Sequence, residues 1–215
     1  MRHDWKESVE FVASGTRLVT ALVEGLDEAE LSAPTTLPGW QRRHLVAHLA
    51  ANAEAIGRLV SWAKTSIPTP MYANPEQRNR DIERGARRSA GELVSWLHTA
   101  STSLAAEFAE MTPAARHQIV RTAQGRNVPA SETAWMRARE VLIHAVDLDC
   151  GVSFADLPEA FLVQLRDEIL SKRADEEVPA LEGDVPQVVA YLSGRPFTGV
   201  ARVDAEPLQT LRPWL

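Results

Sequence analysis

The chain has 215 residues, of which 45% are hydrophobic and 24% are charged, a composition typical of a globular protein with a substantial core. The formal net charge of −6 argues against nucleic acid as a partner, because phosphate binding needs a basic surface. The single cysteine, Cys150, cannot form an intramolecular disulfide, no apolar run is long enough to span a bilayer, and the charged N-terminal residues are unlike a signal peptide. We therefore expect a cytoplasmic protein without a membrane partner, in which Cys150 is a buried, inert thiol.

The first half of the chain predicts helices separated by proline-containing connectors. Apolar residues recur at helical spacing over 4–25, and a connector over 27–39 precedes a second helix expected over 40–64. Asn74-Pro75 combines a side-chain cap with proline at the first helical position. A third helix is therefore expected over 74–111, a length typical of a helical bundle.

The second half predicts two further helices and a small mixed tail. Residues 112–130 are ambiguous between extended and irregular chain, and Ser131 is a candidate cap for a fourth helix over 131–149. The remaining expected elements are a helix over 158–173, an acidic linker over 175–186, a short helix over 185–192 and a strand over 199–204. Long helices with short to medium connections favour a four-helix bundle of antiparallel neighbours.

Glu140 and His144 form the clearest candidate site. Because they are four residues apart on the predicted fourth helix, their side chains share one face of it. Val141 and Ala145 lie on the same face, which therefore points toward the bundle interior. A buried carboxylate beside an imidazole needs a partner. A metal held by two nitrogens and one carboxylate oxygen is one such partner, although this spacing alone more often marks an ordinary satisfied pair.

A third metal ligand has to come from another helix, and His44 and His48 on the second helix are the candidates. His44 is close to the predicted helix start beside Arg42 and Arg43, where exposure to solvent is expected. His48 lies in a more apolar stretch and is the preferred ligand. Taken alone, His48 is more often a core or boundary histidine.

The sequence around these residues resembles the mycothiol-dependent maleylpyruvate isomerase family. The similar segments are LPGW at 37–40, HLVAHL at 44–49, MYANPEQR at 71–78, REVLIHAVDL at 139–148 and LSGRP at 192–196. Together they touch nearly the whole chain, and the combination is specific although no single segment is.

The resemblance implies a mainly α fold: a DinB-like metal-binding four-helix bundle over 1–152, followed by a small α/β C-terminal unit over 153–215. It implies zinc, or another divalent metal such as nickel or iron, bound by His48, Glu140 and His144. It also implies mycothiol as the thiol cofactor. Because the tail is short, the C-terminal unit is expected to be reduced.

The implied reaction is the cis–trans isomerisation of maleylpyruvate to fumarylpyruvate, a step of gentisate degradation. A thiolate held at the open zinc position adds to the conjugated alkene, permits rotation about the resulting single bond, and then leaves. The substrate is a dianion, and arginine suits it because a planar guanidinium binds carboxylates with two hydrogen bonds. Arg78 and Arg195 are the candidate catalytic residues, and the plainer interpretation makes them a solvated helix-end charge and a turn residue.

Two further residues are assigned around the predicted centre. Asn52, one turn after His48, is with Arg78 a candidate contact to the cofactor. Asp147 is a candidate hydrogen-bond acceptor for His144, although a purely local contact fits equally well.

Three other functions use the same residues. A thiol S-transferase would join the thiol to an electrophile without releasing it. A non-enzymatic bundle would bind the metal only. Metal-assisted hydrolysis would place water at the open position, but the sequence offers no separate base for it.

Overall fold

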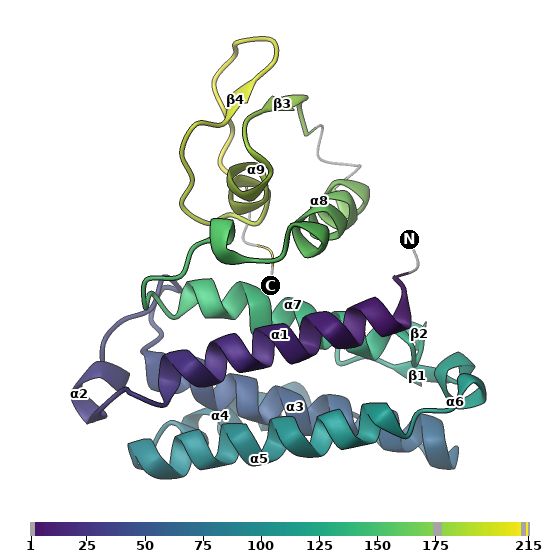
Figure 1. Cartoon of the computed structure of the whole chain (residues 1–215). Coiled ribbons are helices and arrows are strands. Elements are labelled where there is room, and N and C mark those ends of the chain that lie inside the picture. Colours follow the sequence, from purple (N-terminus) through teal and green to yellow (C-terminus); the bar gives the residue numbers. More distant parts are fainter. Residues whose placement is uncertain (1–2, 174–177, 212–213, 215) are drawn as a thin grey trace. The chain divides into compact units, whose positions relative to one another are not determined.

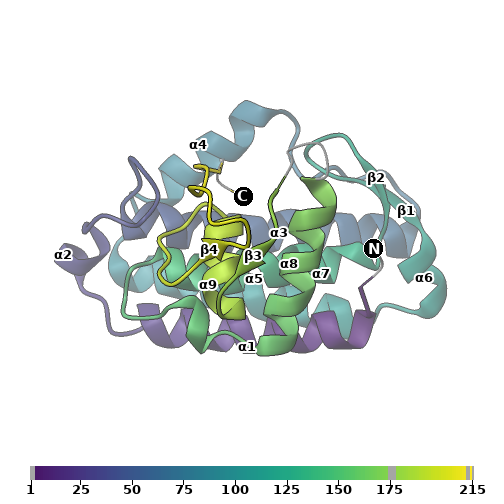
Figure 2. The same ribbon diagram turned by 90° about the horizontal axis from the view of Figure 1, so that it is seen from above.

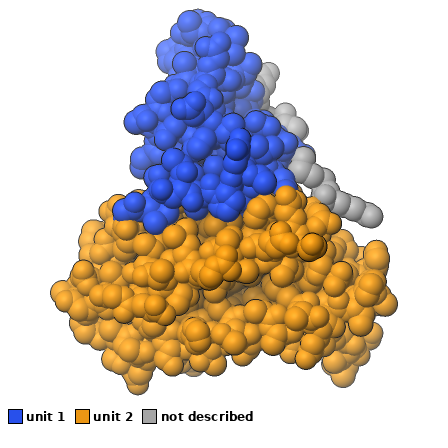
Figure 3. All heavy atoms as spheres, viewed as in Figure 1, with its two compact units in different colours: residues 1, 151–215 blue, residues 2–150 orange. Residues whose placement is uncertain are grey.

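The computed structural model describes residues 3–173, 178–211 and 214. The chain forms two compact units, and the boundary between them lies between Cys150 and Gly151 (Figure 3). This boundary falls close to the one predicted after residue 152. The division into a metal-binding domain over 1–152 and a C-terminal unit over 153–215 stays a prediction.

The first unit is built on four long helices, which confirms the predicted mainly α bundle. These are α1 (Trp5–Val23), α3 (Arg42–Thr65), α5 (Ala90–Ala109) and α7 (Glu132–Asp147). Helix α1 packs against α7 and α5, while α3 packs against α5 and α7 (Figure 1). The pairs α1/α3 and α5/α7 are therefore diagonal. This differs from the expectation that helices consecutive in the chain are neighbours, because the connectors over 24–41 and 110–131 are long enough to cross the bundle.

The predicted single helix over 74–111 is wrong. It is two helices, α4 (Pro75–Gly85) and α5, and α4 lies outside the bundle against α3 (Figure 2). The start of α5 has its own cap, since the Ser89 amide and hydroxyl both donate to Glu92 Oε2, at 2.9 and 2.7 Å. A side chain added at Gly85 would lie 2.9 Å from the Ala47 Cβ on α3. The absence of a side chain therefore allows the end of α4 to approach α3 closely.

The connectors contain short elements that periodicity did not reveal. Helix α2 (Glu28–Leu31) begins at a capping box formed by Asp27 and Glu30. The ambiguous segment holds helix α6 (Pro113–His117) and an antiparallel hairpin of β1 (Ile119–Arg121) and β2 (Asn127–Pro129). The paired residues Val120 and Val128 are both buried, so the hairpin has one apolar face.

The second unit is a small α/β structure, as predicted. It contains a 3-10 turn η1 (Phe154–Asp156), α8 (Glu159–Lys172), β3 (Leu181–Glu182), α9 (Val185–Leu192) and β4 (Ala201–Arg202). Helices α8 and α9 pack together, and β3 pairs with β4 in antiparallel register. The predicted linker over 175–186 falls partly outside the described residues, and its described part contributes β3 and the start of α9. Among the described residues, no helix has the length and apolar character needed to cross a membrane.

At Gly15, α1 approaches α7 closely. A Cβ at Gly15 would lie 2.5 Å from Val141 Cγ2 and 2.9 Å from Leu142 Cγ, which is closer than van der Waals contact. Gly15→Ala is expected to lower the free energy of unfolding by about 1–3 kcal/mol, because the added methyl group overpacks this contact. Chemical denaturation measures the change.

Gly57→Ala in α3 is the matched control, since a Cβ there meets no atom within 4 Å. It is expected to raise the free energy of unfolding by up to about 1 kcal/mol through reduced unfolded-state entropy. Equal destabilisation by both substitutions would contradict the proposed close approach of α1 and α7.

Candidate metal centre

Helices α3 and α7 bring the three predicted metal ligands together in the first unit. His48 Nε2 lies 2.8 Å from Glu140 Oε2, and His144 Nε2 lies 3.4 Å from the same oxygen. One ligand atom from each residue lies within 4.8 Å of the others, and no other described group of His, Cys, Asp and Glu meets this condition. The geometry suits one small cation contacted by two imidazoles and one carboxylate.

The centre is buried but open at its carboxylate. His48 and His144 are each 4% exposed, whereas the Glu140 side chain keeps 18% of its surface accessible. Burial lowers the pKa of the His48 imidazole below its usual value, so this ring is neutral at neutral pH. Burial alone would raise the pKa of Glu140, but its hydrogen bonds with His144 and His48 outweigh burial and hold that pKa well below the usual range. A carboxylate and a neutral imidazole are the forms that bind a metal.

A second layer of hydrogen bonds orients His144. Its Nδ1 lies 2.8 Å from Asp147 Oδ2, and Thr36 Oγ1 donates to Asp147 Oδ1 at 3.0 Å. The Nδ1 hydrogen is therefore directed at Asp147, so Nε2, which faces Glu140, is the ring nitrogen that a metal can take once it is deprotonated. Burial opposes protonation of His144, but the hydrogen bonds to Asp147 and Glu140 outweigh it and raise the pKa of this ring. The predicted contact between Asp147 and His144 is confirmed.

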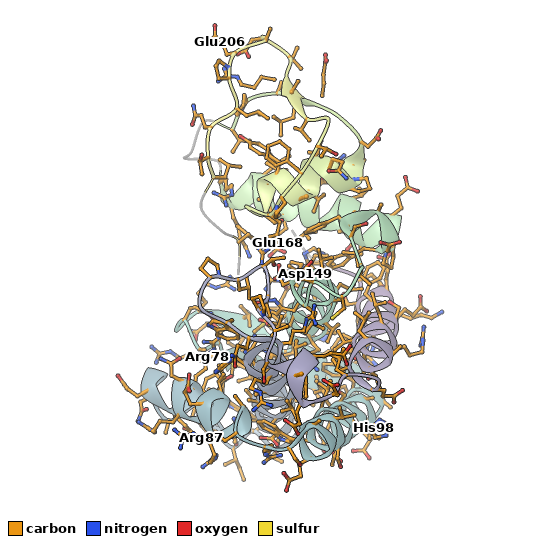
Figure 4. All side chains as sticks on the ribbon, turned by 90° about the vertical axis from the view of Figure 1, so that its left-hand side faces the viewer. Arg78, Arg87, His98, Asp149, Glu168 and Glu206 are labelled. Carbon is orange, nitrogen blue, oxygen red and sulfur yellow. The ribbon has the colours of Figure 1, made fainter. Side chains whose placement is uncertain are left out.

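Arg78 lies on the other side of His48, near the start of α4 (Figure 4). Its Nη2 is 3.4 Å from His48 Nδ1. A guanidinium can only donate, so Nδ1 accepts here and Nε2 carries the hydrogen that points to Glu140. Arg78, which the sequence placed at a helix end, therefore belongs to the surroundings of the centre and is only partly exposed.

Arg137 is a buried charge beside the centre that sequence reasoning missed. It is 1% exposed, and its Nη1 donates to the Leu49 carbonyl at 2.8 Å and to Asn52 Oδ1 at 2.9 Å. Its Nη2 donates to Ser101 Oγ at 3.3 Å, so this one side chain on α7 bonds to both α3 and α5. Burial lowers the pKa of Arg137 to about 10. This value is still well above neutral pH, so the guanidinium is charged there. Its position three residues before Glu140, on the inward face of the predicted helix, was the available signal.

The remaining candidates lie in other surroundings. Asn52 is buried with its amide oxygen bound by Arg137, and its contact to a cofactor stays a prediction. His44 Nδ1 accepts from the Gln41 amide at the start of α3, away from the cluster. Arg195 is buried in the second unit, where its Nη1 donates to the backbone carbonyls of Ser193 and Trp214. Its catalytic role also stays a prediction.

Cys150 is only partly buried, so the predicted burial is wrong, but its surroundings disfavour a reactive thiol. Its Sγ donates to the Leu148 carbonyl at 3.4 Å, and burial raises the pKa of the thiol. A raised pKa reduces the thiolate fraction, and the thiolate is the nucleophilic form.

His48→Ala is expected to abolish stoichiometric zinc binding, because it removes one of three ligands that converge on one point. His44→Ala, one turn earlier on α3, is the matched control and is expected to retain zinc. Metal analysis of purified protein after dialysis measures both. Retention of one zinc per chain by His48→Ala would show that the ligand assignment is wrong.

The chain is similar to one known family and to solved structures of a member of it. The family model of the mycothiol maleylpyruvate isomerase N-terminal domain matches residues 12–149. The crystal structure of the mycothiol-dependent maleylpyruvate isomerase is 33% identical in sequence, with a TM-score of 0.91 over 99% of this chain and 98% of that chain. A mutant of that protein with one histidine replaced by alanine matches with a TM-score of 0.90, at the same identity and coverage. No curated protein matches the chain.

This coverage corrects one expectation and assigns the family. Because the alignment leaves almost none of the solved chain unmatched, the C-terminal unit is not reduced relative to that structure. The family match spans more than half of the residues and includes all three clustered candidate ligands. The chain belongs to the mycothiol maleylpyruvate isomerase family.

Proposed function

We propose that this chain is a mycothiol-dependent maleylpyruvate isomerase that uses zinc. The observation that carries the proposal is the convergence of His48, Glu140 and His144 on one point, in a chain that aligns along nearly its whole length with such an isomerase. Two imidazole nitrogens and one carboxylate oxygen leave a fourth position open, which is the arrangement of catalytic rather than structural zinc sites.

The residues present fit the implied groups. The carboxylate of Glu140 and the neutral ring of His48 are in their metal-binding forms, and Asp147 holds the Nε2 of His144 toward the centre. When bound, zinc and mycothiol supply a thiolate at neutral pH, the nucleophile whose reversible addition turns the substrate's double bond into a single bond that can rotate. The two histidine side chains are themselves shielded from water.

The contribution of Arg78 follows from the tautomer of His48. In the form required of a ligand at Nε2, the ring hydrogen sits on Nδ1, where Arg78 can no longer donate. The guanidinium then loses its protein partner at this point and is available to an anionic oxygen beside the centre. We infer that Arg78 binds the substrate's carboxylate or the enolate oxygen that forms during addition, where a preorganised cation lowers the barrier.

Turnover of maleylpyruvate tests the proposed function directly. The zinc-loaded chain is expected to convert maleylpyruvate to fumarylpyruvate only when mycothiol is present, with the thiol recovered unchanged at the end. Chromatography of substrate, product and thiol measures this. Accumulation of a stable thiol conjugate would indicate an S-transferase and contradict the isomerase. Absence of any reaction with zinc and thiol present would contradict both activities.

Arg78→Gln is expected to lower kcat by about 100-fold or more while zinc content is unchanged, as for the loss of one donor to a developing oxyanion. Arg84→Gln on the same helix is the matched control, since Arg84 bonds to Asp81. Steady-state kinetics and metal analysis measure both variants. If both substitutions lowered kcat equally, the effect would come from the overall positive charge of α4, and a specific role of Arg78 would be contradicted.

A further inference from the structure

A cavity of about 730 Å³ lies in the first unit beside Arg78. Its walls are the end of α3, the segment over 68–74, the start of α4 and the turn of the β1–β2 hairpin. The lining residues that carry the argument are Tyr72, Arg78, Arg121 and Gly125. Arg78 also contacts His48, so the cavity adjoins the metal centre.

Both walls of the cavity are held by hydrogen bonds. On one side, Arg58 Nε donates to the Met71 carbonyl at 2.8 Å, and Gln77 Oε1 accepts from the Ala73 amide at 2.6 Å. On the other side, the Gly125 amide donates to the Thr122 carbonyl at 2.9 Å to close the hairpin turn. A cavity with walls fixed in this way is preformed, which is the usual state of a small-molecule site.

The charge of the lining is uniformly positive. Arg78 and Arg121 are its two ionised side chains, and no described lining residue is acidic. Arg121 forms no ion pair with any residue that the structure describes, and its guanidinium lies over the turn. A Cβ at Gly125 would be 3.4 Å from Arg121 Nη2, so the glycine leaves space for it. Two guanidinium groups without carboxylate partners in one cavity favour an anionic occupant.

Tyr72 adds a hydroxyl that has no hydrogen-bond partner among the described residues, although its oxygen is buried. Burial raises the pKa of this phenol, and Arg78 and Glu140 are among the charged groups that act on it. The tyrosine is therefore close enough to feel charged groups of both the cavity, through Arg78, and the metal centre, through Glu140. A buried donor without a partner is costly, and an incoming oxygen atom would satisfy it after a small adjustment.

We propose that this cavity binds the second carboxylate of a linear dicarboxylate, with Arg121 as the residue that selects for it. Arg78 serves the end of the ligand that reacts at the metal centre, and Arg121 serves the far end. This assignment rests on the proposed function and adds its determinant of substrate specificity. The paired cations distinguish a dicarboxylate from a monocarboxylate, which would leave the Arg121 guanidinium unused.

Equilibrium binding without any thiol tests the assignment independently of turnover. The probes are maleate, a cis dicarboxylate, and isocrotonate, which replaces one carboxylate by a methyl group. Calorimetry with the zinc-loaded chain is expected to show tighter binding of maleate than of isocrotonate. Arg121→Gln is expected to raise the Kd of maleate about 10-fold, the weakening caused by loss of one charge-assisted hydrogen bond, and to leave that of isocrotonate unchanged.

Arg126→Gln is the matched control, because the substitution removes the same charge. Arg126 lies in the same hairpin, is exposed and does not line the cavity. Thermal unfolding of both variants checks that the hairpin is intact, and Arg121→Lys is expected to restore part of the maleate affinity. Equal weakening by Arg121→Gln and Arg126→Gln, or no weakening, would overturn the assignment. The assignment would also be overturned if Arg121→Gln raised the half-saturating concentration of mycothiol and left the Kd of maleate unchanged. A third contradicting result is that the unaltered chain binds maleate no better than isocrotonate.

The two proposals fail in different ways. A chain that binds maleate through Arg121 but does not isomerise maleylpyruvate would retain the cavity assignment and lose the proposed function. A chain that isomerises maleylpyruvate with an unchanged KM after Arg121→Gln would retain the function and lose the cavity assignment.

Discussion

The carboxylate of Glu140, held among two imidazoles in the interior of a helical bundle, is the constraint on which the first unit depends. An ionised carboxylate placed there without partners would cost several kcal/mol. His48 and His144 supply those partners from α3 and α7, so the two helices must face each other at this level. The same arrangement presents two imidazole nitrogens and a carboxylate oxygen to one point. The residues that compensate the buried charge are thus also the candidate ligands for a metal.

The surroundings of the centre extend this constraint through the bundle. Arg137 bonds to Leu49 and Asn52 on α3 and to Ser101 on α5, which joins three bundle helices through one buried cation. Asp147 orients His144 and accepts from Thr36, which ties the connector before α3 to the end of α7. These bonds add to the packing of the connectors' short elements α2, α6 and β1 against α3.

Arginines on two sides of the centre have different roles because their partners differ. The two terminal nitrogens of Arg137 donate to acceptors on α3 and α5, so this buried cation serves the structure, whereas Arg78 has one long contact to an imidazole nitrogen. That contact is available only in the tautomer of His48 in which Nδ1 carries no hydrogen.

Sequence periodicity and cap signals located the helices of the bundle, although they merged α4 with α5. Spacing with local polarity determined that Glu140, His144 and a histidine of α3 were candidate ligands. These are local properties, since a spacing of four residues sets a common helix face wherever the helix lies. The family resemblance added the choice of His48 over His44. Only the tertiary structure decided that α1 and α3 are diagonal, that the third predicted helix is two helices, and that Arg137 is buried against Asn52. It also brought Arg121, from the segment that was ambiguous in sequence, into one cavity with Arg78. Such contacts join residues far apart in the chain, and no local pattern encodes them, because the packing of whole helices determines which side chains meet.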